Sequence, residues 1–201
     1  MIVVLYSVGV VGHSIIELRD LMLMLTPLTL LVSGIIVIPV SDNHPNYKLI
    51  IWMSLTYLLT FAAEVIGVQT GFIFGKYQYG DTLGLKLLDV PLIIGFNWVL
   101  IILGAVSIAK SIDKNIYITS TLTAVLAVIF DLMLEPIAIE LDYWNWTDGG
   151  IPLRNYYAWF AIAFTSSFLF DRMNVNLMNH AFRFYFIVQL IFFVLLSLIL
   201  E

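Results

Sequence analysis

The sequence predicts an all-α integral membrane protein, a polytopic bundle of six or seven transmembrane helices with two long structured loops on one side. Of its 201 residues, 61% are hydrophobic and only 11% are charged, and the mean hydropathy is +1.00. A soluble domain is about 45–50% apolar and about a quarter charged, so a fold in water would expose too much apolar surface. The apolar residues also form long continuous runs, whereas the strands of a transmembrane β-barrel alternate apolar and polar positions.

A spanning helix needs about 20 mostly apolar residues to cross a hydrocarbon core of about 30 Å. In chain order, the candidate spans are residues 2–18, 21–40, 48–72, 90–109, 115–138, 156–171 and 183–200. The first and sixth runs are short, so each is open to being tilted, re-entrant or extended by a turn. We expect the chain to be one transmembrane helical domain over residues 1–201, and its N-terminus to belong to the mature protein because it lacks the basic start of a signal peptide.

The connections between these spans can be assigned to two sides of the membrane by counting crossings. One side receives the connections near 17–20, 73–89 and 139–155, and the other receives those near 41–47, 110–114 and 172–182. The two long loops stay together even if the first run does not span. The nine Lys and Arg residues divide almost evenly between the sides, so the positive-inside rule leaves the orientation open.

Composition also excludes several functional classes. A net charge of −5 gives no basic surface for nucleic acid. The absence of Cys excludes disulfides, thiolate metal sites and thiol nucleophiles. All five Lys residues fall in loops or at the ends of predicted spans, so the chain is not a retinal protein. His13 has no second His or Cys at ligand spacing, and two acids alone are weak support for a metal, so no metal and no cofactor are expected.

Ionisable residues inside spans are expensive in lipid and mark candidate functional sites. Glu64, Asp131 and Glu135 are such residues, and all three lie toward the side with the long loops. Asn97 lies about two turns into the next helix from that side, beside Trp98. Polar groups from three helices are therefore expected to meet at similar depth.

Asp131 and Glu135 are four residues apart and share one face of a helix. Two adjacent carboxyl groups in a low-dielectric site do not both ionise, so one of them is expected to keep its proton near neutrality. Pro136 removes an N–H and kinks the helix beside the acids, which frees a backbone carbonyl that can orient a water. The alternative is that both acids only form hydrogen bonds that hold neighbouring helices together.

The loop at 71–84 (GFIFGKYQYGDTLG) is rich in glycine and aromatic residues, a composition typical of a structured lid. It contains no phosphate-binding G-x-x-x-x-G-K-[ST] motif. Tyr77, Tyr79, Trp144 and Trp146 are as well explained by an aromatic belt at the membrane interface as by a site.

Three blocks carry a resemblance to a known family: EVIGVQTGFIFGKYQYGDTLGLKLLDVP at 64–91, FDLMLEPIA at 130–138 and YWNWTDGGIPLRNYYAWF at 143–160. With the region of Trp98, they resemble the bacterial and archaeal carotenoid biosynthesis membrane protein family, with a core of about residues 55–160. The E-x-x-G-x-x-T-G…F-G-x-Y-x-Y pattern is the most specific part. Ile73 stands where proline is expected and Gln69 where a basic residue is common.

The resemblance implies a cofactor-independent carotenoid hydratase in the cell membrane, acting on a lipid-soluble carotenoid, with other carotenoid enzymes as candidate partners. Such an enzyme adds water to the terminal double bond of an acyclic (ψ) end group and gives a 1-hydroxy carotenoid. A carboxylic acid protonates the less substituted carbon, and water captures the tertiary cation, which aromatic faces stabilise. We expect Asp131 and Glu135 to supply the acid, with Glu64 as an alternative acid or as the carboxylate that orients water. The expected substrate-binding residues are Tyr77, Tyr79, Asp81, Asp89, Asn97, Trp98, Trp144, Trp146 and Asn155.

Three alternatives stay open at this point. A carotenoid end-group cyclase begins with the same protonation but quenches the cation with an internal double bond. A small transporter or proton-relay protein also contains buried acids, although no inverted repeat is evident. A carotenoid-binding or scaffold subunit would tolerate loss of the acids.

Overall fold

The computed structural model describes residues 1–40, 47–176 and 180–200. Within these ranges the chain forms seven helices and four short strands. In chain order the helices are α1 (Ile2–Ser14), α2 (Ile16–Val40), α3 (Tyr47–Thr70), α4 (Leu92–Ile112), α5 (Ile116–Glu140), α6 (Leu153–Arg172) and α7 (Ala181–Leu200). The strands are β1 (Tyr77–Tyr79), β2 (Lys86–Leu87), β3 (Val90–Pro91) and β4 (Trp144–Trp146). Most of the predicted connection at 41–47 and part of the one at 172–182 lie outside the described residues.

This architecture confirms the predicted all-α membrane protein. Five of the described helices, α2, α3, α4, α5 and α7, are long and apolar enough to cross a membrane. Helix α6 has 20 residues but is less apolar than these five, because it carries charged and polar side chains at both ends. Helix α1 has 13 residues and is about 20 Å long, less than the hydrocarbon thickness of about 30 Å.

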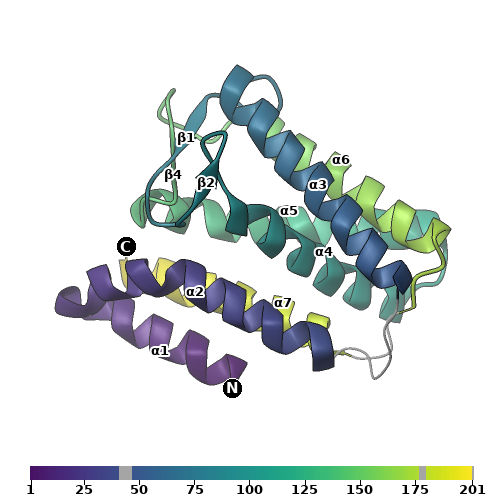
Figure 1. Cartoon of the computed structure of the whole chain (residues 1–201), viewed down its shortest axis with the longest axis horizontal. Coiled ribbons are helices and arrows are strands. Elements are labelled where there is room, and N and C mark those ends of the chain that lie inside the picture. Colours follow the sequence, from purple (N-terminus) through teal and green to yellow (C-terminus); the bar gives the residue numbers. More distant parts are fainter. Residues whose placement is uncertain (41–46, 177–179, 201) are drawn as a thin grey trace.

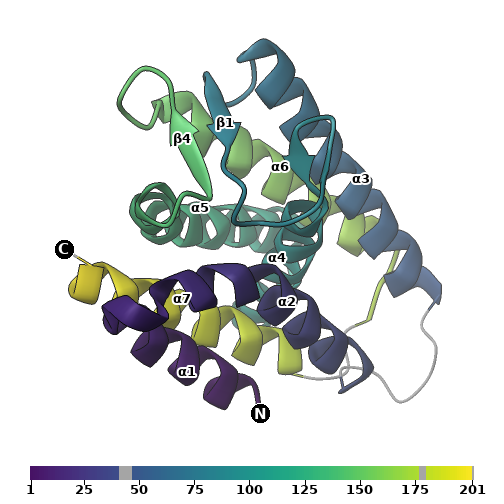
Figure 2. The same ribbon diagram turned by 60° about the vertical axis from the view of Figure 1, so that its left-hand side comes forward.

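Helix α4 is the most enclosed of these five helices, with 78% of its most apolar stretch buried. It contacts α3, α5 and α7, while α6 packs along α5, and α1 and α2 form a hairpin that lies against α7 (Figures 1 and 2). The uniformly apolar sequence of α4 reflects this central position, because a helix surrounded by other helices buries every face.

The boundary between the first two helices differs from the predicted connection near 17–20. Helix α1 ends at Ser14, Ile15 is extended (φ −103°, ψ 114°), and α2 starts at Ile16. Arg19, from the first turns of α2, donates a hydrogen bond from Nε to the backbone carbonyl of His13 (3.4 Å), which the end of α1 leaves free. Polar residues 17–20 therefore form the first turns of α2, and one extended residue makes the turn.

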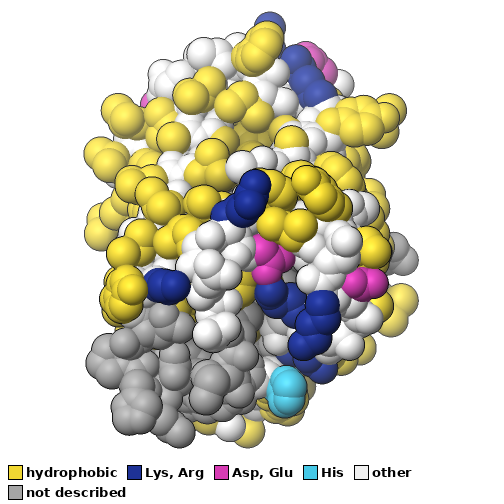
Figure 3. Space-filling model, turned by 90° about the vertical axis from the view of Figure 1, so that its right-hand side faces the viewer, with side chains coloured by type: hydrophobic (Ala, Val, Ile, Leu, Met, Phe, Trp, Pro, Cys, Tyr) yellow, Lys and Arg dark blue, Asp and Glu magenta, His cyan; other side chains and the backbone are white. Residues whose placement is uncertain are grey.

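Both long loops lie at one end of the bundle, as the crossing count predicts. The β1–β4 ribbon and the β2–β3 hairpin gather there, beside the end of α5 and the start of α6 (Figure 1). The opposite end carries several Lys and Arg side chains with a few acidic ones between them (Figure 3). There Lys110 forms an ion pair with Asp171, which also accepts a hydrogen bond from Thr119. The long loops are thus positioned to cover the helix ends nearest the buried acids.

Candidate active site

Three buried carboxyl groups meet beneath the loops. Glu64 on α3 is 4% exposed, and Asp131 and Glu135 on α5 are each 1% exposed. The ion pairs of the described residues are Lys86–Asp81 and Lys110–Asp171, so none of the three carboxyl groups has a cationic partner there. Their polar contacts are therefore hydrogen bonds from neutral groups.

Glu135 accepts three hydrogen bonds from N–H groups. The indole nitrogens of Trp144 and Trp146 donate to its Oε2 at 3.0 and 2.9 Å. Asn155 Nδ2 donates to its Oε1 at 3.0 Å and to Asp131 Oδ2 at 2.7 Å. Asn155 lies in the first turn of α6, so this single amide joins both acids of α5 to the neighbouring helix.

Glu64 is held by the loop instead. The hydroxyl of Tyr77, on β1, donates a hydrogen bond to Glu64 Oε2. Burial is the largest cause that raises the pKa of Tyr77 and of Tyr79 well above the usual value for tyrosine, and the nearby Glu64 raises both further. Both phenols therefore stay protonated and act as hydrogen-bond donors in this site.

The strand pairing explains why four aromatic residues face the acids together. β1 and β4 are antiparallel, with Tyr77 opposite Trp146 and Tyr79 opposite Trp144. Alternate residues of a strand share a face, and Gln78 between the two tyrosines is exposed. The ring centroids are 5.0 Å apart for the first pair and 5.8 Å apart for the second. The Y-x-Y and W-x-W spacings thus build one aromatic face over the carboxyl groups.

Two glycines let this ribbon approach the helices. A Cβ on Gly67, one helical turn after Glu64, would lie 2.6 Å from the ring of Phe74 and 3.0 Å from the hydroxyl of Tyr77. Gly75 has φ +131°, and a Cβ there would lie 2.6 Å from Pro152. Side chains at either position would push the ribbon away from the acids.

The remaining wall is a stack of aromatic rings that includes two residues absent from the expected site. Trp98 on α4 stacks on Trp159 of α6 with centroids 3.7 Å apart, and Trp159 stacks on Phe74 at 5.1 Å. Trp159 follows Asn155 by four residues, so the shared helix face is a signal that could have identified it. Phe74 lies inside the block that carries the family resemblance.

These groups enclose a small cavity of about 20 Å³, lined by all three acids, Asn155 and the aromatic residues. A buried water needs about 10–15 Å³ of such space together with two or more polar partners. The cavity therefore has room for one water beside the carboxyl groups. It brings together nine of the expected site residues: Glu64, Tyr77, Tyr79, Trp98, Asp131, Glu135, Trp144, Trp146 and Asn155.

Three expected site residues lie elsewhere. Asp81 is exposed and pairs with Lys86 (2.8 Å), and Asp89 is exposed and accepts a hydrogen bond from Gln69 (3.1 Å). Asn97 points toward α7, where its Oδ1 accepts hydrogen bonds from Tyr185 and Gln189. Consecutive helical residues are about 100° apart, so while Trp98 faces the acids, Asn97 points to a different side, toward α7.

No group of three or more His, Cys, Asp or Glu in the described part of the chain is arranged to hold a metal ion. The three carboxyl groups are instead occupied by neutral donors. The chemistry that this arrangement supports is proton transfer in an aromatic, nearly dry site.

Comparison with known proteins places the chain among related sequences. The profile of a family described as carotenoid biosynthesis protein matches residues 8–200. The chain is also similar to the bisanhydrobacterioruberin hydratase of Haloarcula japonica, with 31% identity over 155 residues, or 70% of this chain and 49% of the relative. It thus spans about half the length of that relative. No solved structure matches.

Proposed function

This chain belongs to the carotenoid biosynthesis protein family, and we propose that it hydrates the terminal double bond of an acyclic carotenoid end group without a cofactor. The substrate is an apolar polyene dissolved in the bilayer, and the cell membrane is the site of action. The name of the Haloarcula japonica relative supports a hydratase. The observation that carries the proposal is the cluster of three buried carboxyl groups around a cavity with room for one water.

Unequal hydrogen bonding divides the roles of the two acids on α5. Glu135 accepts from three N–H groups, which favours its carboxylate form. Asp131 is 1% exposed and shares with Glu135 only the amide of Asn155, without an indole donor of its own. Asp131 is therefore the proton donor, and Glu135 is the base.

The reaction then balances within the site. Asp131 gives its proton to the less substituted carbon of the double bond, and the tertiary carbon becomes cationic. Water attacks that carbon, and the proton released by the water goes to Glu135. Transfer of this proton to Asp131 restores the starting state, so the net change is the addition of one water.

The surroundings favour the charge that develops. Aromatic faces attract a desolvated cation by about 2 kcal/mol or more, and Tyr77, Trp98 and Trp146 line the same cavity as the acids. Glu64, fixed by Tyr77, is suited to orient the attacking water.

An isoprenoid end group is larger than a cavity of about 20 Å³. Substrate entry therefore requires an aromatic side chain to move, and Trp144 and Trp146 are suited to this because they lie on a three-residue strand rather than on a helix. This movement breaks the indole hydrogen bonds to Glu135, and the return of the side chains forms them again.

The test is expression of the chain in a bacterial host that accumulates lycopene or γ-carotene, followed by chromatography and mass spectrometry of the pigments. We expect a more polar product that is heavier by one water. An isomer of unchanged mass would identify a cyclase instead. Unchanged pigments, with the protein shown to be in the membrane and the bacterioruberin precursor also tried, would reject the proposal.

A further inference from the structure

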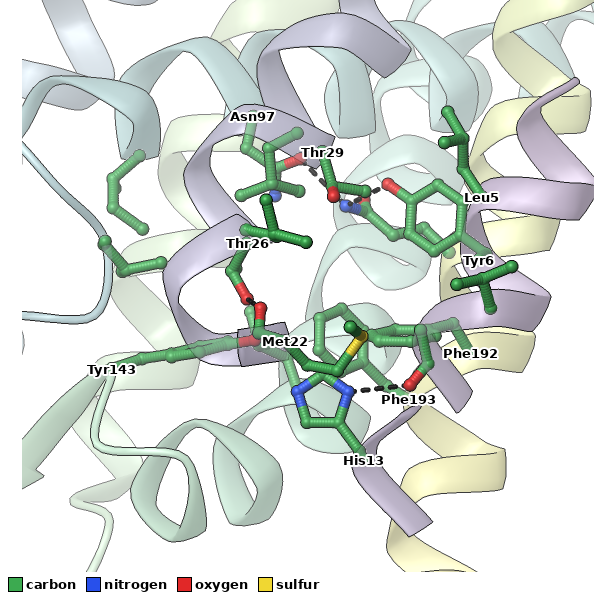
Figure 4. A pocket seen from close by; sticks show the side chains of 18 of the residues that line it. Leu5, Tyr6, His13, Met22, Thr26, Thr29, Asn97, Tyr143, Phe192 and Phe193 are labelled. Atoms are coloured by element: carbon green, nitrogen blue, oxygen red, sulfur yellow. Dashed lines mark hydrogen bonds between the residues drawn. The ribbon is translucent and has the colours of Figure 1, made fainter. Parts of the chain in front are cut away.

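A second cavity of about 150 Å³ lies between α1, α2 and α7 (Figure 4). Trp144 lines both this cavity and the acid site. Most of its wall is apolar and includes Leu30, Phe192 and Phe193. Val8 and Leu25, which also line it, are 56% and 38% exposed. An apolar cavity of this size can hold a ring or a branched chain end, and its exposed apolar lining residues leave it open to the surface of the molecule.

A buried polar network occupies one side of the cavity. Gln189 on α7 donates from Nε2 to Asn97 Oδ1 (3.0 Å) and to the hydroxyl of Tyr6 (3.1 Å). These two bonds fix the orientation of the amide. Its Oε1 is then left without a hydrogen-bond partner among the described residues, although Gln189 is fully buried.

His13 on α1 provides a second unpartnered atom. Its Nδ1 lies 2.7 Å from the backbone carbonyl of Gly9, and since a carbonyl only accepts, Nδ1 carries the hydrogen. The neutral ring therefore offers Nε2 as an acceptor, and that atom has no partner in the described part of the chain although His13 is only 3% exposed. Figure 4 shows the ring of His13 at the edge of the cavity, below Met22.

Both unpartnered atoms are acceptors, so a ligand that satisfies either of them is a hydrogen-bond donor with an otherwise apolar body. We propose that this cavity binds the hydroxyl-bearing end of an isoprenoid alcohol, and that it receives the tertiary alcohol after the end group moves past Trp144. The inference rests on the proposed function, because hydration makes an end group of this class. The hydroxyl of a tertiary alcohol satisfies one of the two acceptors, whereas a hydrocarbon end satisfies neither, so the site favours product over substrate.

Direct binding of added pigments tests this proposal apart from turnover. The full-length Asp131→Asn protein is purified in detergent from a host that makes no carotenoids. It is then mixed with equal amounts of three pigments: an acyclic carotenoid hydrocarbon, its tertiary alcohol and the methyl ether of that alcohol. Pigments that remain bound after gel filtration are quantified by chromatography. The alcohol should be retained about two- to tenfold more than the ether, which has the same body but no donor.

Substitutions locate the preference. His13→Phe keeps a ring beside Phe192 and removes the Nε2 acceptor, and Gln189→Met removes Oε1 at similar side-chain length. Removing the acceptor that the hydroxyl uses should reduce the preference, and the double substitution should bring it to unity. Ser166→Ala, which removes an unpartnered buried hydroxyl away from this cavity, should leave it unchanged. Equal retention of alcohol and ether, no retention of either, or an alcohol preference that survives the double substitution would each overturn the proposal. Because the alcohol is supplied, failure here is distinct from failure of the hydration test.

Discussion

The two acids on α5 lie one helical turn apart but have different neighbours. Glu135 faces two indole N–H groups and the amide of Asn155, whereas Asp131 shares only that amide. No cation of the described residues pairs with either acid. The difference in hydrogen-bond donors is therefore what allows one acid to hold a proton while the other accepts one.

The substitution Asp131→Asn tests this division. We expect turnover to fall about 10²–10⁴-fold, the usual contribution of a general acid, while the protein stays folded because the new amide oxygen can still accept from Asn155. Pigment conversion per amount of membrane-inserted protein is the measurement. Glu140→Gln, an exposed acid-to-amide change at the end of the same helix, should keep full activity. Full activity in Asp131→Asn would show that the proton comes from elsewhere.

Tyr143, at the edge of the second cavity, makes stability depend on pH. Burial raises the pKa of Tyr143 from 10.0 to about 12. The unfolded chain releases this proton near pH 10, so the stabilisation is complete below pH 10 and is lost as the pH rises toward 12.

Above pH 10, the free energy of unfolding of the wild type should therefore fall relative to Tyr143→Phe by about 1.4 kcal/mol per pH unit. Denaturation of both proteins in the same detergent from pH 8 to 12 measures the difference, with conditions below pH 9 serving as the internal control. Parallel profiles across the whole range would mean that Tyr143 titrates normally in the folded protein.

Among the structural elements, the β1–β4 ribbon has the largest effect on the site, because it carries both indole donors and both phenols. Its approach to the helices depends on Gly75, where a Cβ would lie 2.6 Å from Pro152 and 3.0 Å from Trp146. A displaced ribbon would lengthen the hydrogen bonds to Glu135.

Gly75→Ala should therefore lower turnover about 10–100-fold through misplaced groups, with a loss of stability of about 1–3 kcal/mol. Gly149→Ala is the matched control, since Gly149 also has positive φ (+74°) but nothing within 4 Å of an added Cβ. It should carry only the cost of backbone strain, about 1 kcal/mol, and keep its activity. Equal loss of turnover in both variants would show that strain, and not the position of the ribbon, is responsible.

At this scale the sequence supports some inferences better than others. The apolar runs predict the helices, and the i, i+4 spacing predicts that Asp131 and Glu135 share a face. The expectation that Asn97 meets the acids is wrong. Trp98 beside it faces them, and adjacent helical residues point about 100° apart. Chain position alone groups Asp81 and Asp89 with the site, but the loop backbone turns them outward, where they meet Lys86 and Gln69.

The whole molecule concentrates its chemistry at one end. Both long loops gather at one end of the bundle (Figures 1 and 2), and their residues line both the acid site and the second cavity. The position of both loops at one end follows from the number of helices between them, which the sequence alone predicts. The pairing of β1 with β4 could not be read in this way, because three-residue strands far apart in the chain carry too little pattern to identify their partners.

Cysteine labelling tests this topology, since the chain has no Cys of its own. Single substitutions Asp81→Cys and Gly149→Cys, one in each long loop, should react with an impermeant thiol reagent from the same side of the membrane. Lys114→Cys, in the connection between α4 and α5, should react only from the other side. Wild-type protein is the blank. Labelling of Asp81→Cys and Lys114→Cys from one side would contradict the arrangement of helices.

The most direct measurement follows the atoms of the added water. Purified protein in lipid nanodiscs is given an acyclic carotenoid in water labelled with deuterium and oxygen-18, with no cofactor added, and the product is examined by mass spectrometry. We predict one labelled oxygen and one stable carbon–deuterium bond for each hydrated end, and neither label with Asp131→Asn. Deuterium without oxygen would indicate cyclisation. A hydroxylated product whose oxygen does not come from water would contradict hydration by this site.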